Sequence, residues 1–444
     1  MKHSFYKFFS AFLLIAFSFQ SCVEVHNTYS KIAPGTWRAV LHFFPSAVTP
    51  NPKGQRLPEK MNLKMEEFTE GDLPFTLDIN YKTQNDVEVV LHNAEENITI
   101  GPEDIFIGRD PKTGLDTIRI NFAVYNTYIK AIYRERVMEG EWVSPAKKSS
   151  IPFEAHQGQD YRFTQLAKPP IANLTGNFET IFNDTDSTSY KAVGEFKQNG
   201  NTLTGTFRTE TGDYRYLQGE VQGDKLYLSC FDGSHAFLFE GKILADKSFS
   251  GIFRAGKSNP EIFTAKFNPN AALTNSDALT KAIAPSAAVS FSFANADGKF
   301  VSLDQLGDKV KIIQIMGTWC PNCRDETNFL KEYVANNPNK DVAVVALAFE
   351  RNPEVAVQQI KVYKEKMQVP YQILLAGTST NKDSTSKKLP FLDKVIAYPT
   401  LIHLDRKNRI RNIHTGFDGP ATSKYADYKK EFSALTDKLL SEKQ

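Results

Sequence analysis

Two cysteines separated by two residues form the pattern most able to do chemistry, in the stretch MGTWCPNCR at 316–324. Cys320 and Cys323 could form a reversible dithiol/disulfide couple, supply half of a metal site, or pack as core residues. A structural zinc site needs four Cys or His ligands, usually as two spaced pairs. No second CxxC or HxxxH occurs, and His403 and His414 lie far downstream without paired spacing. The sequence therefore predicts no metal site.

The first 22 residues, MKHSFYKFFSAFLLIAFSFQSC, predict an export signal. They contain a basic start, an apolar run too short for a spanning helix, and a small residue directly before Cys22. The pattern fits a cleaved secretory signal with an incidental cysteine, or a lipoprotein signal (1–21) whose Cys22 becomes the lipidated N-terminus of a tether (22–30). We favour the lipoprotein, held in the periplasm or cell envelope. Because disulfides persist in exported proteins, this location favours a redox couple at Cys320 and Cys323.

The overall charge gives no sign of a nucleic-acid partner. Lys and Arg (53) nearly balance Asp and Glu (51), the net charge is +2, and no block of like charge occurs. The 444 residues, 41% of them hydrophobic, suffice for roughly two or three globular domains. After the N-terminal run, no stretch reaches the roughly 18 apolar residues of a membrane helix. We expect contact with the membrane through the lipid alone.

Residues 31–267 are predicted to form an all-β domain, a barrel- or sandwich-like antiparallel meander. Short alternating segments such as FTLDINYKT (75–83) are joined by Asn-Gly and Gly-Asp turns, which are hairpin signals. A meander closes into a barrel or stacks into a sandwich to avoid exposed edges. A seam near AKPPIANLTG would divide this domain into subdomains 31–166 and 172–267. The sequence leaves open whether these are one body or two.

A glycine followed two residues later by a large aromatic residue recurs irregularly through this half. We interpret it as a strand start that directs the aromatic side chain into one shared core. The irregular spacing argues against a true repeat. The five glycines are Gly35, Gly140, Gly176, Gly205 and Gly251. Cys230, in an alternating strand, is predicted to be a small buried hydrophobic residue.

The pattern changes after a predicted linker at 268–286, which is rich in Ala, Asn, Ser and Pro and has room for one helical turn. Continuous apolar runs at 310–317 and 341–349 are typical of buried parallel strands. Amphipathic helices follow both runs, the second with Asn352 as N-cap and Pro353 in its first turn. A strand pair and a last helix complete the order β-α-β-α-β-β-α. The domain at 287–444 is therefore predicted to be an α/β sandwich.

The CxxC pair falls between a buried strand and the start of a helix, where free N–H groups and the helix dipole favour a thiolate. Cys320, at the helix threshold, is predicted to be the attacking nucleophile, and Cys323, one turn in, the resolving thiol. Pro321 suits the first helical position because it has no N–H to satisfy. Trp319 either offers a flat apolar wall to a substrate or fills the core.

Two segments of the C-terminal domain resemble thioredoxin-fold proteins of the TlpA/ResA type. They are FANADGKFVSLDQLGDKVKIIQIMGTWCPNCRDE (293–326) and YPTLIHLDRKNRI (398–410). Proteins of this type are exported thiol–disulfide oxidoreductases, and the resemblance covers roughly residues 285–444. It implies a cis peptide at Tyr398–Pro399 beside the cysteines, with the Tyr398 backbone free to pair with an extended substrate. The alternative is an ordinary trans turn.

The same resemblance implies that Glu350, ending the strand VALAFE, has a raised pKa and moves protons for Cys323. The alternative is an acid that faces water. The predicted substrate-binding residues are Trp319, Pro321, Tyr398, Pro399 and Thr400.

Several positions depart from that family without removing a reacting group. QIMG (314–317) replaces the common Phe-Trp-Ala, Thr327 replaces a frequent Pro, and Ala397 replaces the Gly of the cis loop. Asn408 stands where a Gly often turns the hairpin, which Asn tolerates. These changes and the insert AGTSTNKDSTSKKLP (376–390) leave the form of the substrate groove open.

The expected function is that of a membrane-anchored disulfide reductase of the periplasm, with no cofactor beyond the Cys320–Cys323 disulfide. Its expected partners are exported proteins with disulfides and a membrane electron donor of the DsbD/CcdA type. The alternative is a lipoprotein whose β-domain binds a peptide, glycan or partner, with the thioredoxin-like unit presenting it. Peroxidase chemistry is disfavoured because GTWCPNC lacks a Pro/Thr-rich peroxidatic loop.

Overall fold

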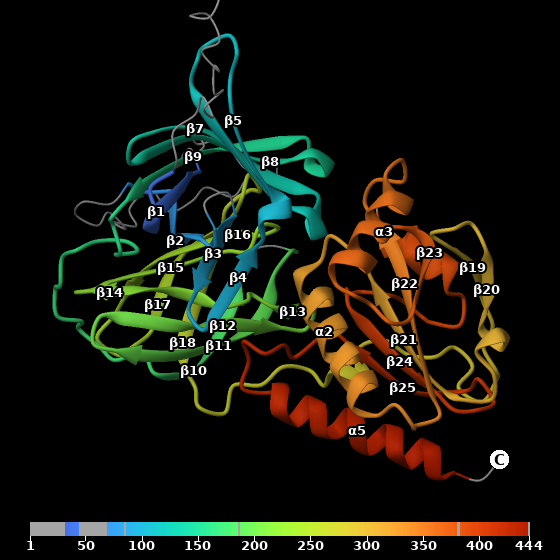
Figure 1. The fold of residues 1–444 in the computed structure, drawn as a ribbon. Helices are drawn as coiled ribbons and strands as arrows, with labels where there is room; N and C mark the ends of the chain where they lie inside the picture. The colour runs from blue at the N-terminus through green and yellow to red at the C-terminus, as the bar shows by residue number, and fades with distance from the viewer. Residues whose placement is uncertain (1–31, 44–68, 84–85, 185–186, 380–381, 443–444) are drawn as a thin grey trace, which may run out of the picture.

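The computed structural model describes residues 32–43, 69–83, 86–184, 187–379 and 382–442. The predicted signal peptide, the tether and Cys22 lie outside the described residues. An all-β region precedes an α/β domain (Figure 1), so the predicted multidomain fold class is confirmed. Within the described ranges, none of the helices has the length and apolar character needed to cross a bilayer.

The β-region, strands β1 to β18, begins with an antiparallel sheet of nine strands in the order β4-β3-β2-β1-β9-β8-β7-β6-β5. Alternation sets its two faces: along β7, every second residue from Thr127 to Tyr133 is buried. Short 3₁₀ turns η1 (Pro102–Asp104), η2 (Ala123–Tyr125) and η3 (Pro145–Lys147) join some of the strands. The strands of this first sheet are β1 (Gly35–His42), β2 (Asp72–Tyr81), β3 (Val87–Asn93), β4 (Glu96–Ile100), β5 (Ile105–Arg109), β6 (Asp116–Phe122), β7 (Thr127–Arg134), β8 (Val137–Ser144) and β9 (Ser149–Gln157).

The second half of the β-region closes into a barrel. Strand β10 pairs with both β11 and β18, and β11 also pairs with β12, so the antiparallel ring has no open edge apart from the short β13 added to β12. Phenylalanines such as Phe182, Phe207 and Phe239 fill its interior. The strands are β10 (Gly176–Phe182), β11 (Tyr190–Asn199), β12 (Thr202–Thr209), β13 (Gly212–Asp213), β14 (Leu217–Gln222), β15 (Lys225–Phe231), β16 (Ala236–Ile243), β17 (Phe249–Ala255) and β18 (Glu261–Phe267).

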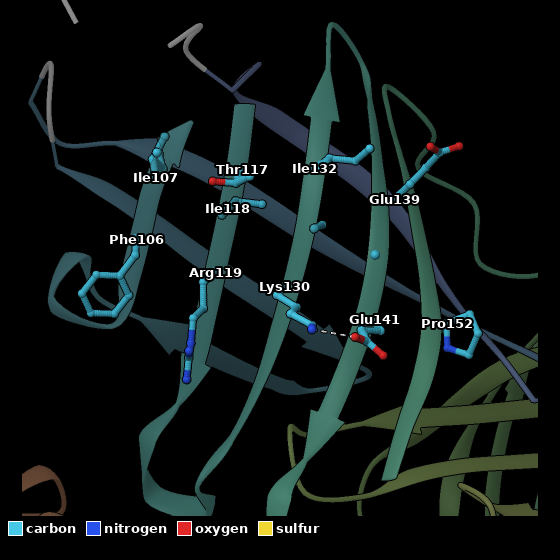
Figure 2. A pocket seen from close by; sticks show the side chains of 13 residues that line it. Phe106, Ile107, Thr117, Ile118, Arg119, Lys130, Ile132, Glu139, Glu141 and Pro152 are labelled. Atoms are coloured by element: carbon cyan, nitrogen blue, oxygen red, sulfur yellow. Dashed lines mark ion pairs between the residues drawn. The ribbon is translucent and has the colours of Figure 1, made fainter. Parts of the chain in front are cut away.

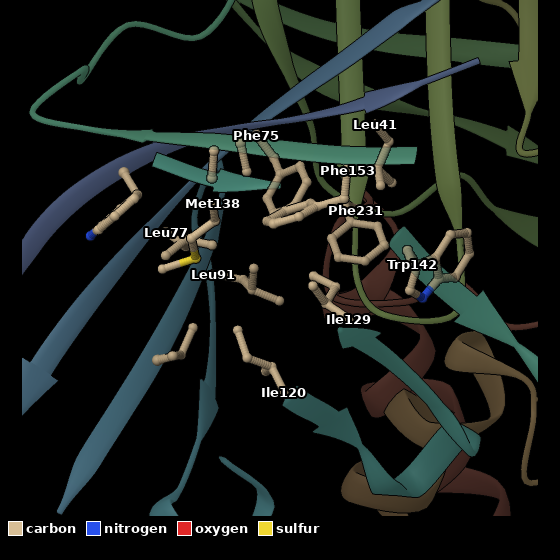
Figure 3. Close-up of a cluster of buried hydrophobic side chains, with 14 of the residues drawn as sticks. Leu41, Phe75, Leu77, Leu91, Ile120, Ile129, Met138, Trp142, Phe153 and Phe231 are labelled. Carbon is tan, nitrogen blue, oxygen red and sulfur yellow. The ribbon is translucent and has the colours of Figure 1, made fainter. Parts of the chain in front are cut away.

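One hydrophobic core joins the first sheet to the outside of the barrel. Phe231, from β15 of the barrel, lies among aromatic side chains of the first sheet (Figure 3). Its ring centroid is 4.6 Å from that of Phe75, 5.5 Å from Phe122 and 5.2 Å from Trp142. The two halves of the β-region are therefore held together by buried apolar surface.

The recurring Gly–aromatic pattern does place each aromatic residue in a core, but in two cores instead of one. Trp37 and Trp142 belong to the shared core, and Phe178, Phe207 and Phe253 to the barrel interior. The predicted role of the glycines as strand starts is correct for Gly35 and Gly176 and wrong for the other three. Gly140, Gly205 and Gly251 lie within strands, where an added Cβ would collide with the backbone of the neighbouring strand.

The C-terminal domain, strands β19 to β25 with helices α2 to α5, is built on a mixed sheet of seven strands in the order β20-β19-β23-β22-β21-β24-β25. Strands β21, β22 and β23 are parallel and the others antiparallel. Helices α2, α3 and α5 pack on one face of the sheet. The strands are β19 (Ser292–Asn295), β20 (Phe300–Ser302), β21 (Val310–Met316), β22 (Val342–Glu350), β23 (Gln372–Thr378), β24 (Thr400–Leu404) and β25 (Ile410–Thr415). The helices are α2 (Pro321–Asn336), α3 (Ala356–Lys366), α4 (Lys382–Lys388), α5 (Tyr425–Ser441), η4 (Ser276–Ala278) in the predicted linker and η5 (Leu303–Leu306).

The predicted order of elements in this domain is incomplete. It lacks β23, which lies between β19 and β22, and α4, which occupies the insert. Strand β23 runs directly into the polar insert, which hid its end, and α4 has the sequence KDSTSKK without apolar periodicity. The predicted cap is also wrong, because α3 begins at Ala356 and the Asn352 side chain instead accepts from the Glu354 N–H in a preceding turn, at 3.0 Å.

Candidate active site

The two cysteines of the CxxC motif lie where β21 ends and α2 begins. They form a disulfide, with Cys320 as the N-cap of α2 and Pro321 in its first turn. The Cys323 N–H points at the Cys320 sulfur over 3.2 Å, so the helix N-terminus faces the atom that would carry a thiolate charge. Cys320 is 6% exposed and Cys323 fully buried. What little access there is leads to Cys320, the predicted nucleophile.

The Tyr398–Pro399 peptide is cis, as the resemblance implied. The carbonyl oxygen of Tyr398 lies 3.4 Å from the Cys320 sulfur, so this loop reaches the disulfide. Thr400 starts β24 and is fully buried, and its hydroxyl donates to the Ala397 carbonyl at 2.9 Å. Thr400 therefore supports the cis loop from behind, whereas the backbone of Tyr398 faces the reacting sulfur.

The Trp319 side chain is half-buried and contacts Phe349, Tyr398 and Arg351. Its indole N–H donates to the Phe349 carbonyl at 3.0 Å, and its ring meets that of Tyr398 edge-on, with centroids 5.4 Å apart. The Arg351 guanidinium lies 3.7 Å from the centre of the Trp319 ring. One face of the indole is thus covered by a cation, which makes Trp319 part of the wall of the site instead of a free apolar surface.

Glu350 ends β22 and is 4% exposed. Thr318, two residues before Cys320, donates to it twice: from its N–H to Oε1 at 3.0 Å and from its hydroxyl to Oε2 at 2.8 Å. Burial raises the pKa of Glu350, while the two Thr318 hydrogen bonds oppose the rise. The carboxyl is therefore buried with a raised pKa, as predicted, and it reaches the active-site turn through Thr318.

A second buried carboxyl, Glu326, was not singled out by the sequence analysis. It lies in α2 three residues after Cys323 and is fully buried. The Tyr428 hydroxyl donates to its Oε1 at 3.2 Å. Burial raises the pKa of Glu326 to about 7. Gln314 contacts both Cys323 and Glu326: its Nε2 donates to the Cys323 carbonyl at 3.2 Å, and its side chain also hydrogen-bonds the Glu326 carboxyl. The signal was the three-residue spacing, which places Cys323 and Glu326 on one helix face.

The β-region contributes directly to this site. Ser234, from the turn after β15, donates its hydroxyl to the Trp319 carbonyl at 3.0 Å. Asn322, between the two cysteines, donates its amide to the Asp213 carbonyl of β13 at 3.2 Å. Figure 1 shows α2 facing the β-region with β13 beside it. No sequence pattern indicated this contact, because the residues that make it are far apart in the chain.

A separate groove of about 660 Å³ crosses the face of the first sheet (Figure 2). It lies over β5 to β9, between the exposed Phe106 and Pro152, and Lys130 and Glu141 form an ion pair across it at 2.8 Å. Cys230 is elsewhere, as a free buried thiol of the barrel. Among the residues that the structure describes, no group of three or more His, Cys, Asp or Glu could hold a metal ion.

Comparison with known proteins points to the same part of the chain. Residues 281–429 match the family model described as Redoxin. The thioredoxin-like protein YneN of Bacillus subtilis is 28% identical over 126 residues, which cover 28% of this chain and 68% of that protein.

Two solved structures are similar as well. One is a thiol:disulfide interchange protein of the thioredoxin family from Chlorobium tepidum, with 20% identity, 36% of this chain and 100% of that chain covered, and a TM-score of 0.29. The other is the thioredoxin domain of a thiol-disulfide oxidoreductase from Bacteroides vulgatus. It is 18% identical, the match covers 33% of this chain and 96% of that chain, and the TM-score is 0.25. Residues 281–429 thus match a redoxin family model, and the chain is similar to a thioredoxin-like protein over 126 residues.

Proposed function

We propose that this protein is an exported, lipid-anchored thiol–disulfide oxidoreductase that reduces disulfides through Cys320 and Cys323. The observation that carries the proposal is the position of the couple. Its outer sulfur lies at the N-terminus of α2, 3.4 Å from the carbonyl of the cis loop. A helix N-terminus lowers the pKa of a thiol and so supplies the thiolate that attacks a disulfide.

The reaction conserves atoms and electrons in two exchanges. The Cys320 thiolate attacks one sulfur of a substrate disulfide, forms a mixed disulfide and releases one substrate thiolate. The Cys323 thiolate then attacks the Cys320 sulfur, releases the second substrate thiolate and leaves the Cys320–Cys323 disulfide. Two electrons have passed to the substrate, so a dithiol donor must reduce the couple again. A membrane donor of the DsbD/CcdA type fits this requirement.

Cys323 must lose its proton before it can resolve the mixed disulfide. Glu350, with its raised pKa and its link to the active-site turn through Thr318, is our first candidate for the acceptor. Glu326 is the second, since it lies one helical turn beyond Cys323 with a pKa of about 7. Single Glu→Gln variants distinguish them, because only loss of the acceptor shifts the pH profile of resolution.

Export and anchoring rest on the N-terminal sequence, with Cys22 as the lipidated residue and disulfide-containing exported proteins as substrates. Fractionation of cells expressing the full chain and a Cys22→Ala variant tests this part. We expect the chain in the membrane fraction and the variant released from it; equal release of both would remove the anchor from the proposal.

The decisive experiment measures the reduction potential of Cys320 and Cys323 in the purified protein, equilibrated with dithiothreitol and read by alkylation. A value near or below about −270 mV supports a reductase, and one near −120 mV means an oxidant of exported thiols. In parallel, Cys323→Ser should trap exported proteins as mixed disulfides on Cys320.

A binding function is the second candidate, favoured by the groove on the first sheet (Figure 2). In that case the β-region captures a peptide, glycan or partner, and the C-terminal domain presents it. Capture that persists in a Cys320→Ser/Cys323→Ser variant and is lost in Phe106→Ala would favour this function over the reductase.

A further inference from the structure

The surface around the disulfide is already occupied by another part of the same chain. The Trp319 carbonyl and the Asn322 amide, on either side of Cys320, are bonded to Ser234 and Asp213 of the β-region. Asn322 is 9% exposed as a result. A protein that brings a disulfide to Cys320 would meet Ser234 and Asp213 at these two positions. Its approach competes with the β-region.

Close contact at this point requires a glycine. Gly212 in β13 has φ +135°, and an added Cβ would collide with the Asn322 amide. The β-region therefore approaches the CxxC turn as closely as a backbone without a side chain allows.

One arginine connects all three parts of the structure beneath this contact. Arg215, fully buried after β13, forms ion pairs with Glu96 of the first sheet at 2.5 Å, with Asp232 of the barrel at 3.5 Å, and with Asp325 of α2. Asp325 lies two residues after Cys323. Because a buried charge is costly without its partners, these pairs favour the docked arrangement over one in which α2 has moved away.

The remaining contacts between the β-region and the C-terminal domain are largely polar. Gln359 of α3 donates to the carbonyls of Ala123 and Val124 at 3.1 and 2.8 Å, and Lys366 pairs with Asp104 at 2.7 Å. Val124 of the β-region, a partly buried side chain, also packs against the core of the C-terminal domain. Interfaces of this polar kind can separate without exposing a large hydrophobic core.

We propose that the β-region is a docked cover over Cys320 and that protein disulfides react only after it separates from the C-terminal domain. The hinge is the linker segment 271–275, because Asn268 is bonded to the barrel and residues from Asp277 onward are bonded to the C-terminal domain. Arg215 holds the docked state. Small reagents reach Cys320 in either state. The substrate selectivity of the couple is thus set by a part of the chain that carries no reacting group. This inference rests on the proposed reductase function.

The test compares how two maleimides of different size react with Cys320. The full chain is first treated with a phosphine, which is oxidised while the disulfide becomes two thiols. After its removal, N-ethylmaleimide or a polymer-bearing maleimide is added, and modification of Cys320 is followed by peptide mass spectrometry. Both reagents attack the same thiolate, so the ratio of their rates reports access and cancels any change in thiol pKa.

Two variants loosen the cover by different means. Gly212→Leu inserts a side chain against Asn322, and Arg215→Gln removes the shared cation. The matched control is Gly200→Leu, a positive-φ barrel glycine (φ +59°) whose added Cβ meets no atom within 4 Å. Circular dichroism verifies folding, and Gly212→Leu keeps the test decisive if Arg215→Gln fails to fold.

We expect the wild-type chain and Gly200→Leu to exclude the polymer reagent. In folded Gly212→Leu, loss of the buried Asn322–Asp213 contact should raise the rate of the polymer reagent, relative to that of N-ethylmaleimide, by about tenfold or more. Equal access of both reagents in the wild-type chain, or an unchanged ratio in Gly212→Leu, would overturn the cover. A couple that forms no reversible disulfide would instead defeat the reductase function, since the access ratio is measured independently of the potential.

Discussion

The β-region has two interfaces, and they differ in kind. Its own halves meet through a buried apolar core in which Phe231 of the barrel touches Phe75 and Trp142 of the first sheet. Its interface with the C-terminal domain is largely polar, with hydrogen bonds and ion pairs around Arg215, the CxxC turn and α3. Apolar surface of the first kind is costly to expose to water, whereas polar groups of the second kind can be solvated when they part. The disulfide lies at the second, polar interface.

The largest expected effect is on catalysis at the polar interface. Cys320→Ser should reduce disulfide reduction to the background rate, because the hydroxyl is a far weaker nucleophile than the thiolate. The measurement is reduction of a protein disulfide by the full chain with dithiothreitol as donor. Cys230→Ala, which alters the buried thiol of the barrel, should retain wild-type rates. Full activity in Cys320→Ser would show that the nucleophile is wrongly assigned.

The next effect tests the apolar interface. Phe231→Ala should lower the free energy of unfolding of the β-region by about 3–5 kcal/mol, because it leaves a cavity in the shared core. Denaturant unfolding followed by tryptophan fluorescence measures this, since Trp37 and Trp142 lie in that core. Phe106→Ala, at a side chain 55% exposed, should change stability by less than about 0.5 kcal/mol. Equal losses in the two variants would mean that the halves of the β-region are not joined by this core.

A third effect depends on pH and lies within the C-terminal domain. The pKa of Glu326 is about 7 when folded, against an ordinary 4.5, so folding favours its protonated form. The contribution of the protonated Glu326 to the free energy of unfolding is fully present below about pH 4.5 and is lost as the pH rises through 7. Glu326→Gln stays neutral and should be more stable than the wild-type chain by up to about 3 kcal/mol at pH 8.

Denaturant midpoints between pH 5 and 8 provide the measurement for Glu326. Glu332→Gln, on the exposed side of the same helix, should keep the wild-type slope of stability against pH. A slope that persists unchanged in Glu326→Gln would assign this titration to another group.

The smallest effect sharpens the contrast between the two interfaces. Gln359→Ala removes two hydrogen bonds to the β-region, each worth about 0.5–1.5 kcal/mol, without opening a core. It should raise the polymer-maleimide rate at Cys320 several-fold and leave the unfolding free energy of the β-region unchanged. The neighbouring exposed residue gives the control, Gln358→Ala. A loss of stability as large as that of Phe231→Ala would remove the distinction between the interfaces.

Local patterns in the sequence predicted the fold class and much of the redox site. A buried strand that runs into a helix with Pro321 in its first turn placed the cysteines, and the resemblance of the segment around Pro399 to a known family implied the cis peptide. The glycines show the limit of such patterns. Gly140 and Gly205 looked like strand starts, but their role is to admit the backbone of a neighbouring strand.

The sequence by itself determined most of the elements and the place of the two cysteines at the start of a helix, because these depend on neighbours within a few turns of chain, whereas the raised pKa of Glu350 was implied only by the resemblance to a known family. Only the tertiary structure decided that Glu326 is buried beside Tyr428 and that Arg215 links α2 to both halves of the β-region. Arg215 and Glu96 are 119 residues apart, and no local periodicity records such a pair. Burial and charge pairing arise from segments that meet only when the chain is folded, so the cover over Cys320 is visible only in three dimensions.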